Sequence, residues 1–291
     1  MKESPLVFDS DGVPLVGMLH DASGHPELGI LFMVAGGPQY RIGGHRQLVQ
    51  WSRQFAAAGI PVFRFDFKGM GDSYGDYAGF EDTGSDIRSA IDCLFREVPS
   101  LKRVALWGEC NACSASLFYA HRDTRVVGVA MLNPWVRTEA GEARAIVKHY
   151  YLNRLMEPSF WRKVLTLQFD VLGSLRSALG LVRKARAVSD EAGQASGSLP
   201  DRMLHGLRRF DGGLMMVMSG RDLVPKEFDD LVASSPAWQA ELAKHSVVRH
   251  DLPMADHTFS CAEWRDQVGD WGVEWLASLR QPAQKNASCE S

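Results

Sequence analysis

VALWGECNACSAS, residues 104–116, is the most informative segment of this chain. It begins as a short apolar run with strand character. It then passes, through Gly108 and Ala112, into small residues and good helix formers. A strand that turns sharply into a helix, with small residues two positions before and two after the central one, is the layout of a nucleophile elbow. The central side chain is expected to project above the strand end from a strained backbone. That residue is usually serine, and here it is Cys110.

A thiol at this position suits nucleophilic catalysis. The first turn of a helix carries unsatisfied N–H groups and the positive end of the helix dipole, which favour a thiolate over a thiol. The backbone N–H of Asn111 is expected to supply half of an oxyanion hole. The competing interpretation is a buried, unreactive cysteine, because free cysteine is among the most buried residue types. The segment departs from the pattern G-x-S-x-G at its third and fifth positions. Residues elsewhere in the chain must therefore decide between the catalytic and the unreactive interpretation of Cys110.

Length and composition indicate an ordinary globular protein. The chain has 291 residues, of which 45% are hydrophobic and 23% charged, enough for one α/β domain with an insertion or for two domains. Its net charge of −3 argues against a nucleic-acid binder. The N-terminus lacks an apolar signal core, and no apolar run approaches membrane-spanning length. We therefore expect a soluble protein of the cytoplasm without an integral membrane segment.

Cysteine usage agrees with this expectation. The chain contains five cysteines, an odd number without a disulfide framework, which fits a reducing compartment. The pair Cys110-x-x-Cys113 has the spacing of a redox motif, but no thioredoxin-like pattern follows it. The sequence offers no metal or organic cofactor site, and none is expected.

Other apolar runs of strand length surround the elbow. Residues 6–19 are typical of a hairpin, because an Asp-Gly pair separates two apolar runs. Strands are predicted at 28–34, 60–65, 126–132, 213–218 and 246–252, those at 28–34 and 126–132 buried, and helices at 45–58, 83–97, 225–240 and 262–279. Strands and helices that alternate in this order predict right-handed crossovers and a mainly parallel central sheet flanked by helices. Such sheets bind ligands at the carboxyl ends of their strands.

The pattern changes between residues 135 and 210. Helical stretches are predicted at 143–154, 160–168 and 171–187, without any strand, and a polar Ser/Gly-rich linker follows at 189–198. We interpret residues 135–210 as an inserted helical lid with a hinge near 193–197. The core then comprises a first part, 1–134, and a second part, 211–280. The polar tail 281–291 is expected to be disordered.

Two polar residues late in the chain could form a catalytic triad with the cysteine of the elbow. Asp222 follows one predicted strand and His257 follows the next, which gives the chain order nucleophile, acid, base found in α/β hydrolases. Cys110 would attack a carbonyl carbon and His257 would take and return the proton. Asp222 would fix the imidazole tautomer and stabilise its charged form. Asp256 is the competing acid, but as the direct neighbour of His257 it is badly placed to orient the ring.

The loop after the strand at 28–34 is expected to complete the pocket. Gly37 offers the second oxyanion N–H, since Pro38 has none. Gln39, Tyr40 and Arg41 follow this loop and, with Trp135, are predicted to contact the substrate. Arg41 could receive an anionic substrate group, although a surface arginine is an equal alternative.

These loops together resemble the α/β-hydrolase superfamily over nearly the full chain. The chain is most similar to the exosortase A system-associated hydrolase 1 family, found among bacterial exopolysaccharide genes. The resemblance is carried by GGPQYR (36–41) with GHR (44–46), DFKGMGDS (66–73), the cysteine elbow, NPW (133–135), KHYY (148–151), GRD (220–222) and ADHTFS (255–260). Asn111 stands where the family usually has aspartate, and Glu109 where an apolar residue is common. The resemblance implies a hydrolase or acyl-transfer role near polysaccharide biosynthesis. The cysteine elbow also resembles that of dienelactone hydrolases, which open cyclic esters.

We therefore expect an α/β-hydrolase fold with an inserted helical lid, and a Cys-His-Asp triad that cleaves an ester or thioester of a small-molecule acyl substrate. Two alternatives stay open. One is acyl transfer to an acceptor other than water by the same triad. The other is a non-catalytic binding module, which the unusual elbow and Glu109 would suit. The oligomeric state is open as well, with a homodimer among the options.

Overall fold

A computed structural model describes residues 2–34, 40–136 and 197–280 of the chain. The helices predicted within 143–187 and the tail 281–291 lie outside the described residues. The predicted hinge does so too, except for Gly197. Among the described helices, none is both long enough and apolar enough to cross a membrane.

The predicted N-terminal hairpin is confirmed. Strands β1 (Glu3–Ser10) and β2 (Val13–His20) pair antiparallel from Ser10 opposite Val13 outward. The turn between them places Asp11 at φ 51° and Gly12 at φ 80°. Both are residue types that tolerate the left-handed region, which a tight hairpin turn with two central residues requires.

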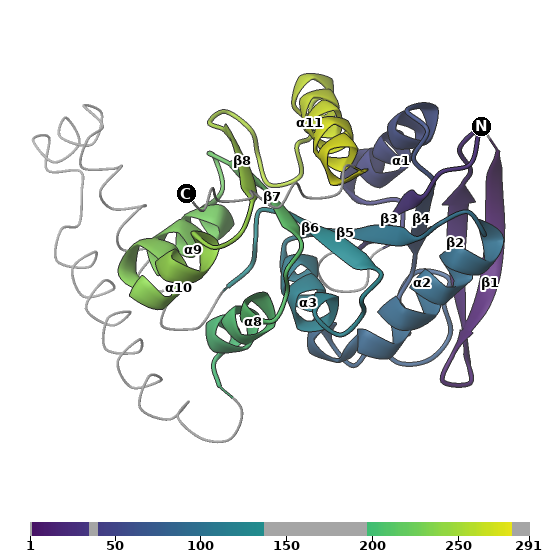
Figure 1. Cartoon of the computed structure of the whole chain (residues 1–291), viewed down its shortest axis with the longest axis horizontal. Helices are drawn as coiled ribbons and strands as arrows, with labels where there is room; N and C mark the ends of the chain where they lie inside the picture. The colour runs from purple at the N-terminus through teal and green to yellow at the C-terminus, as the bar shows by residue number, and fades with distance from the viewer. Residues whose placement is uncertain (1, 35–39, 137–196, 281–291) are drawn as a thin grey trace, which may run out of the picture.

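Eight strands form one sheet in the order β1-β2-β4-β3-β5-β6-β7-β8 (Figure 1). Its further members are β3 (Leu28–Met33), β4 (Val62–Phe65), β5 (Arg103–Glu109), β6 (Val126–Leu132), β7 (Gly213–Ser219) and β8 (Val247–Leu252). The strands from β3 to β8 run parallel, and β2 pairs antiparallel with β4. β3 and β4 are buried along their whole length, as expected of strands covered on both faces.

Helices cover both faces of this sheet. Figure 1 shows α1 (Gln47–Ala57) and α11 (Ala262–Arg280) on one face, and α2 (Gly84–Glu97), α3 (Asn111–Ala120) and α8 (Leu199–Arg208) on the other. Two short 3-10 helices, Gly44–Arg46 and Phe80–Asp82, precede α1 and α2. The predicted strands and the helices at 45–58, 83–97 and 262–279 are thus confirmed within one to three residues at their ends.

The single helix predicted at 225–240 is wrong, because the chain forms two helices there. These are α9 (Leu223–Ser234) and α10 (Pro236–Leu242). Pro236 has no N–H to donate and disfavours the helical conformation of the residue before it. Ser235 accordingly adopts φ −117° and ψ 104°, which is extended backbone.

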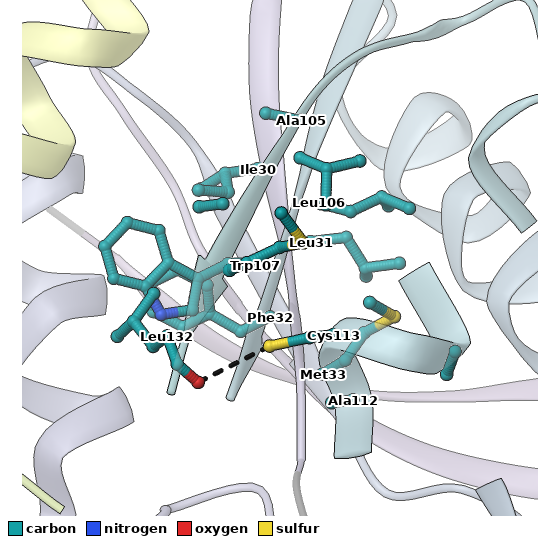
Figure 2. Close-up of a cluster of buried hydrophobic side chains, with 14 of the residues drawn as sticks. Ile30, Leu31, Phe32, Met33, Ala105, Leu106, Trp107, Ala112, Cys113 and Leu132 are labelled. Atoms are coloured by element: carbon teal, nitrogen blue, oxygen red, sulfur yellow. Dashed lines mark hydrogen bonds between the residues drawn. The ribbon is translucent and has the colours of Figure 1, made fainter. Parts of the chain in front are cut away.

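The core is densest around β5. Trp107 packs against three aromatic rings on the face that α1 and α11 cover, with ring centroids 5.3 to 5.5 Å away from those of Phe32, Trp51 and Phe55. A Cβ on Gly272 of α11 would come within 2.8 Å of the Trp107 ring, so this glycine lets the helix approach. Figure 2 shows the apolar side chains of β3 and β5 around the start of α3.

Only the ends of the predicted lid, residues 135–136 and 197–210, belong to the described part of the chain. Within them α8 begins with a capping box between Ser198 and Asp201 and packs directly on α3. A Cβ on Gly206 would lie 2.1 Å from the backbone oxygen of Leu117, so the two helices nearly touch. The division of the chain into core and lid stays a prediction.

Candidate active site

The turn between β5 and α3 has the geometry of a nucleophile elbow. Cys110 caps the N-terminus of α3 with φ 56° and ψ −123°, a conformation that costs about 1–3 kcal/mol for a residue with a side chain. Gly108 makes the turn possible, because a Cβ there would lie 2.6 Å from the backbone carbonyl of Ala112. The Cys110 backbone is held on both sides: its N–H donates to Leu132 O (2.8 Å) and its C=O accepts from Trp135 N (3.2 Å).

His257 connects this cysteine to a carboxylate. Its Nδ1–H donates to Asp222 Oδ2 at 2.5 Å, and the Cys110 side chain lies close enough to the ring to raise its pKa. Burial alone would lower the pKa of His257, but the interactions with Asp222 and Cys110 outweigh it and raise the pKa to about 10. Both neighbours thus favour the imidazolium form of the ring. About a third of the side chain, 36%, stays exposed, which leaves room for a reactant beside it.

Helix geometry fixes the carboxylate. Asp222 is the N-cap of α9, and its Oδ1 accepts from Val224 N at 3.1 Å while Oδ2 faces His257. One side chain thus caps a helix and orients the imidazole, so it cannot rotate away from either partner without losing a hydrogen bond. Asp256 instead accepts from the N–H and the hydroxyl of Ser260 and makes no hydrogen bond to His257 within the described residues.

Asn133 hydrogen-bonds both β7 and the loop that carries His257, a role that sequence reasoning missed. This buried residue directly follows β6 at φ 49°, and its own N–H donates to Val217 O. Its Nδ2 donates to the backbone oxygen of His257 at 2.8 Å, and its Oδ1 accepts from Ser219 N at 2.8 Å. The side chain therefore fixes the backbone of the histidine loop relative to β7. The Asn-Pro pair after an apolar strand was the available signal, since Asn tolerates positive φ better than other residues with a side chain.

The second cysteine of the Cys110-x-x-Cys113 pair faces the core. The Cys113 thiol donates to the backbone oxygens of Gly108 (3.2 Å) and Leu132 (3.4 Å), the second of which Figure 2 shows as a dashed line. Burial raises its pKa well above the usual range, so it is unsuited to form a thiolate. Only Cys110 of this pair lies beside a base.

Of the two predicted oxyanion-hole donors, only Asn111 lies within the described residues. Asn111 is the first residue of α3, where backbone N–H groups point out of the helix toward its N-terminal end. Gly37, the predicted second donor, lies outside the described residues, as does Gln39.

The predicted substrate contacts near residue 40 are tied to carboxylates of the protein. Arg41 forms ion pairs with Asp66 and Asp72, and its backbone N–H donates to Asp66 Oδ1 at 2.6 Å. Tyr40 is half exposed, and its hydroxyl donates to Asp72 Oδ1 at 3.1 Å. Trp135 lies next to the elbow through its backbone bond to Cys110. An anion that binds Arg41 would have to compete with two carboxylates already bound to it.

A groove of about 930 Å³ lies between α2, α3 and α8. Lys68, Arg122 and Asp201 are among the mixed charged residues that line it, and none of the triad residues does. It is therefore separate from the reacting groups.

Among the described residues, no group of three or more His, Cys, Asp or Glu side chains could hold a metal ion.

Comparisons with known proteins agree with the fold. No protein-family model matches the chain, and no curated protein sequence does. An esterase from Pyrococcus furiosus is similar in structure, with a TM-score of 0.64 at 14% identity, over 95% of this chain and 91% of that one. A dienelactone hydrolase from Anabaena variabilis is similar over 95% and 97% of the two chains, with a TM-score of 0.60 at 15% identity.

An α/β hydrolase from Vibrio vulnificus gives a TM-score of 0.60 at 14% identity, over 94% of this chain and 80% of the other. Identities this low show the architecture and leave the chemistry to the residues of the site. The strand order, the elbow and these similarities together establish that the chain has the α/β-hydrolase fold.

Proposed function

We propose that the protein hydrolyses an ester or thioester through an acyl-enzyme formed on Cys110. The observation that carries the proposal is the position of the His257 ring, which hydrogen-bonds the Asp222 carboxylate and lies close enough to Cys110 at the elbow for that side chain to raise its pKa. An inert structural cysteine needs neither a strained backbone nor a histidine oriented by a carboxylate.

The proposed reaction has two steps. Cys110 Sγ, as a thiolate paired with the His257 imidazolium, attacks the carbonyl carbon, and the negative charge passes to the carbonyl oxygen. The bond to the leaving oxygen or sulfur then breaks, and His257 gives its proton to the leaving group. In the second step neutral His257 takes a proton from water, the resulting hydroxide attacks the thioester carbon, and Cys110 leaves as a thiolate. The Asn111 N–H would donate to the oxyanion in both steps.

The similarity to exosortase A system-associated hydrolases supports a finer proposal. It would place the acyl substrate near bacterial exopolysaccharide synthesis in the cytoplasm. The support is the set of sequence motifs, above all the loops around Arg41, Asp222 and His257.

The test uses 4-nitrophenyl acetate and an acetyl thioester as probes. We expect the intact wild-type protein to gain one acetyl group, which peptide mass spectrometry locates on Cys110, and to release it to water with turnover. Cys110→Ala should abolish both. Cys261→Ala, a change at the half-buried cysteine directly before α11, should abolish neither. Full turnover in Cys110→Ala would refute the proposal. Added amine or thiol acceptors that collect the acetyl group faster than water would identify an acyltransferase instead.

A further inference from the structure

Glu109, the residue directly before Cys110, is an ionisable group that the reaction as written does not use. It ends β5 with 6% of its surface exposed, although glutamate is rarely buried without a charged partner. Gln47, the first residue of α1, is 1% exposed, and its Nε2 donates to Glu109 Oε2. The two side chains form a buried acid–amide pair beside the elbow.

This pair has one donor too few for a carboxylate. Glu109 Oε1 and Gln47 Oε1 are both buried and have no hydrogen-bond partner within the described part of the chain. Gln47 Nε2 serves only the other carboxyl oxygen. A proton on the Glu109 carboxyl would supply a further donor at this pair, and it would also remove the cost of a buried charge.

Burial of Glu109 favours the same form, against the charge of its strongest charged neighbour. Burial is the largest influence and raises its pKa to about 7. The His257 imidazolium and the Gln47 hydrogen bond act in the opposite direction, and the carboxylates of Asp222 and Asp256 raise the pKa further. These groups come from α1, the loop before α9 and the loop before α11, the elements that surround the end of β5. Near neutral pH the group therefore changes between an uncharged acid and a buried carboxylate.

We propose that Glu109 acts on the reaction as an uncharged carboxylic acid, held by Gln47, which keeps a second negative charge away from the Cys110 thiolate and the oxyanion. The inference rests on the proposed function. Like charges at one buried site oppose each other, and the thiolate forms on the residue directly after Glu109, which shares with Glu109 the influence of His257. Glu109 works through Cys110 and is a positioning residue. The ionised form is the less active one, so acylation slows as pH rises through about 7.

The test compares Glu109→Gln with wild type in the rate of Cys110 acetylation by 4-nitrophenyl acetate. Glutamine keeps the shape and the uncharged state of the acid and cannot ionise. The ratio of the variant's rate constant to the wild-type one should rise about ten-fold between about pH 6 and about pH 8, because a single ionisation near 7 removes about nine-tenths of the protonated form. Using the ratio cancels the ionisations that both proteins share.

Asp256→Asn is the matched control. It also removes a carboxylate that acts on Glu109, but the pKa of Asp256 is lowered and the group stays charged throughout this range. Its rate ratio to wild type should therefore change with pH far less than that of Glu109→Gln. A second readout keeps the proposal testable if Glu109→Gln does not fold: wild type grown with carbon-13-labelled glutamate should show an infrared band of a protonated carboxylic acid that disappears as pH rises through about 7.

The outcomes separate the two proposals. A rising ratio, or the titrating acid band, supports the role of Glu109. A ratio that stays constant while Cys110 is still acetylated, or the absence of the acid band at about pH 6, overturns that role and leaves the proposed hydrolase intact. Wild-type Cys110 that gains no acetyl group at any pH overturns the proposed function, and the role of Glu109 with it.

Discussion

Asn133 shows how one side chain can align a reaction centre without taking part in the chemistry. It bonds the histidine loop and β7 at the same time, so its loss should let His257 shift relative to Cys110. A displacement of about 1 Å in a catalytic group costs on the order of a hundred-fold in rate. A substitution of Asn133 therefore tests whether the rate depends on the geometry of the triad.

We predict that Asn133→Gly lowers kcat about 10- to 100-fold with little change in KM. Glycine accepts the positive φ of this position, so the variant removes the side chain alone. Two buried backbone groups lose their partners, which should lower the free energy of unfolding by about 2–4 kcal/mol. Steady-state kinetics and urea unfolding measure the two effects.

Ser10→Ala is the control for stability. It breaks a buried hydrogen bond to Asp86 at 2.6 Å, on the opposite side of the sheet order from β7, and should destabilise the fold without changing kcat. Equal loss of kcat in both variants would mean that Asn133 matters only for folding.

At the scale of the element, the elbow depends on the contact between β5 and α3. A side chain at Gly108 would meet backbone atoms of Ala112 and Cys113 at 2.6 to 2.8 Å, and backbone cannot move aside as a flexible side chain can. The start of α3 would have to shift away from the strand. The same shift would move Cys110, which lies between the two elements.

Gly108→Ala should therefore lower the free energy of unfolding by about 1–3 kcal/mol, the usual cost of overpacking. Gly84→Ala, at the first residue of α2, is the matched control, because a Cβ there meets only atoms at 3.9 Å or more. That variant should be neutral or slightly stabilising. Chemical denaturation of both proteins gives the comparison, and equal stabilities would contradict the close approach at the elbow.

Elements were predictable where local patterns determine them. The Asp-Gly hairpin, the apolar parallel strands and the small residues of the elbow appear in the structure close to their expected bounds. The break between α9 and α10 was missed, although Pro236 carried the signal, because an apolar helical pattern continues on both sides of it.

At the scale of the whole molecule, the site joins loops that follow β5, β6, β7 and β8 in the chain. Chain order and the carboxyl ends of parallel strands were enough to suggest that Cys110, Asp222 and His257 meet. The contacts that support them were not predictable, because Asn133 and Gln47 bind partners 62 to 124 positions away. Polar residues with such distant partners leave no periodic pattern in a sequence. The ion pairs of Arg41 with Asp66 and Asp72 escaped prediction for the same reason.

The most direct measurement is the rate at which iodoacetamide alkylates each of the five cysteines near pH 7, resolved by peptide mass spectrometry, in wild type and His257→Ala. Accessibility alone would favour Cys261 over the buried Cys93, Cys110 and Cys113, and burial raises the pKa of Cys93 to about 11. An activated pair predicts instead that Cys110 reacts about ten-fold or more faster than Cys261, and that His257→Ala removes this advantage. If Cys261 reacts first in wild type, or if Cys110 reacts equally fast without His257, Cys110 is not the nucleophile of a triad.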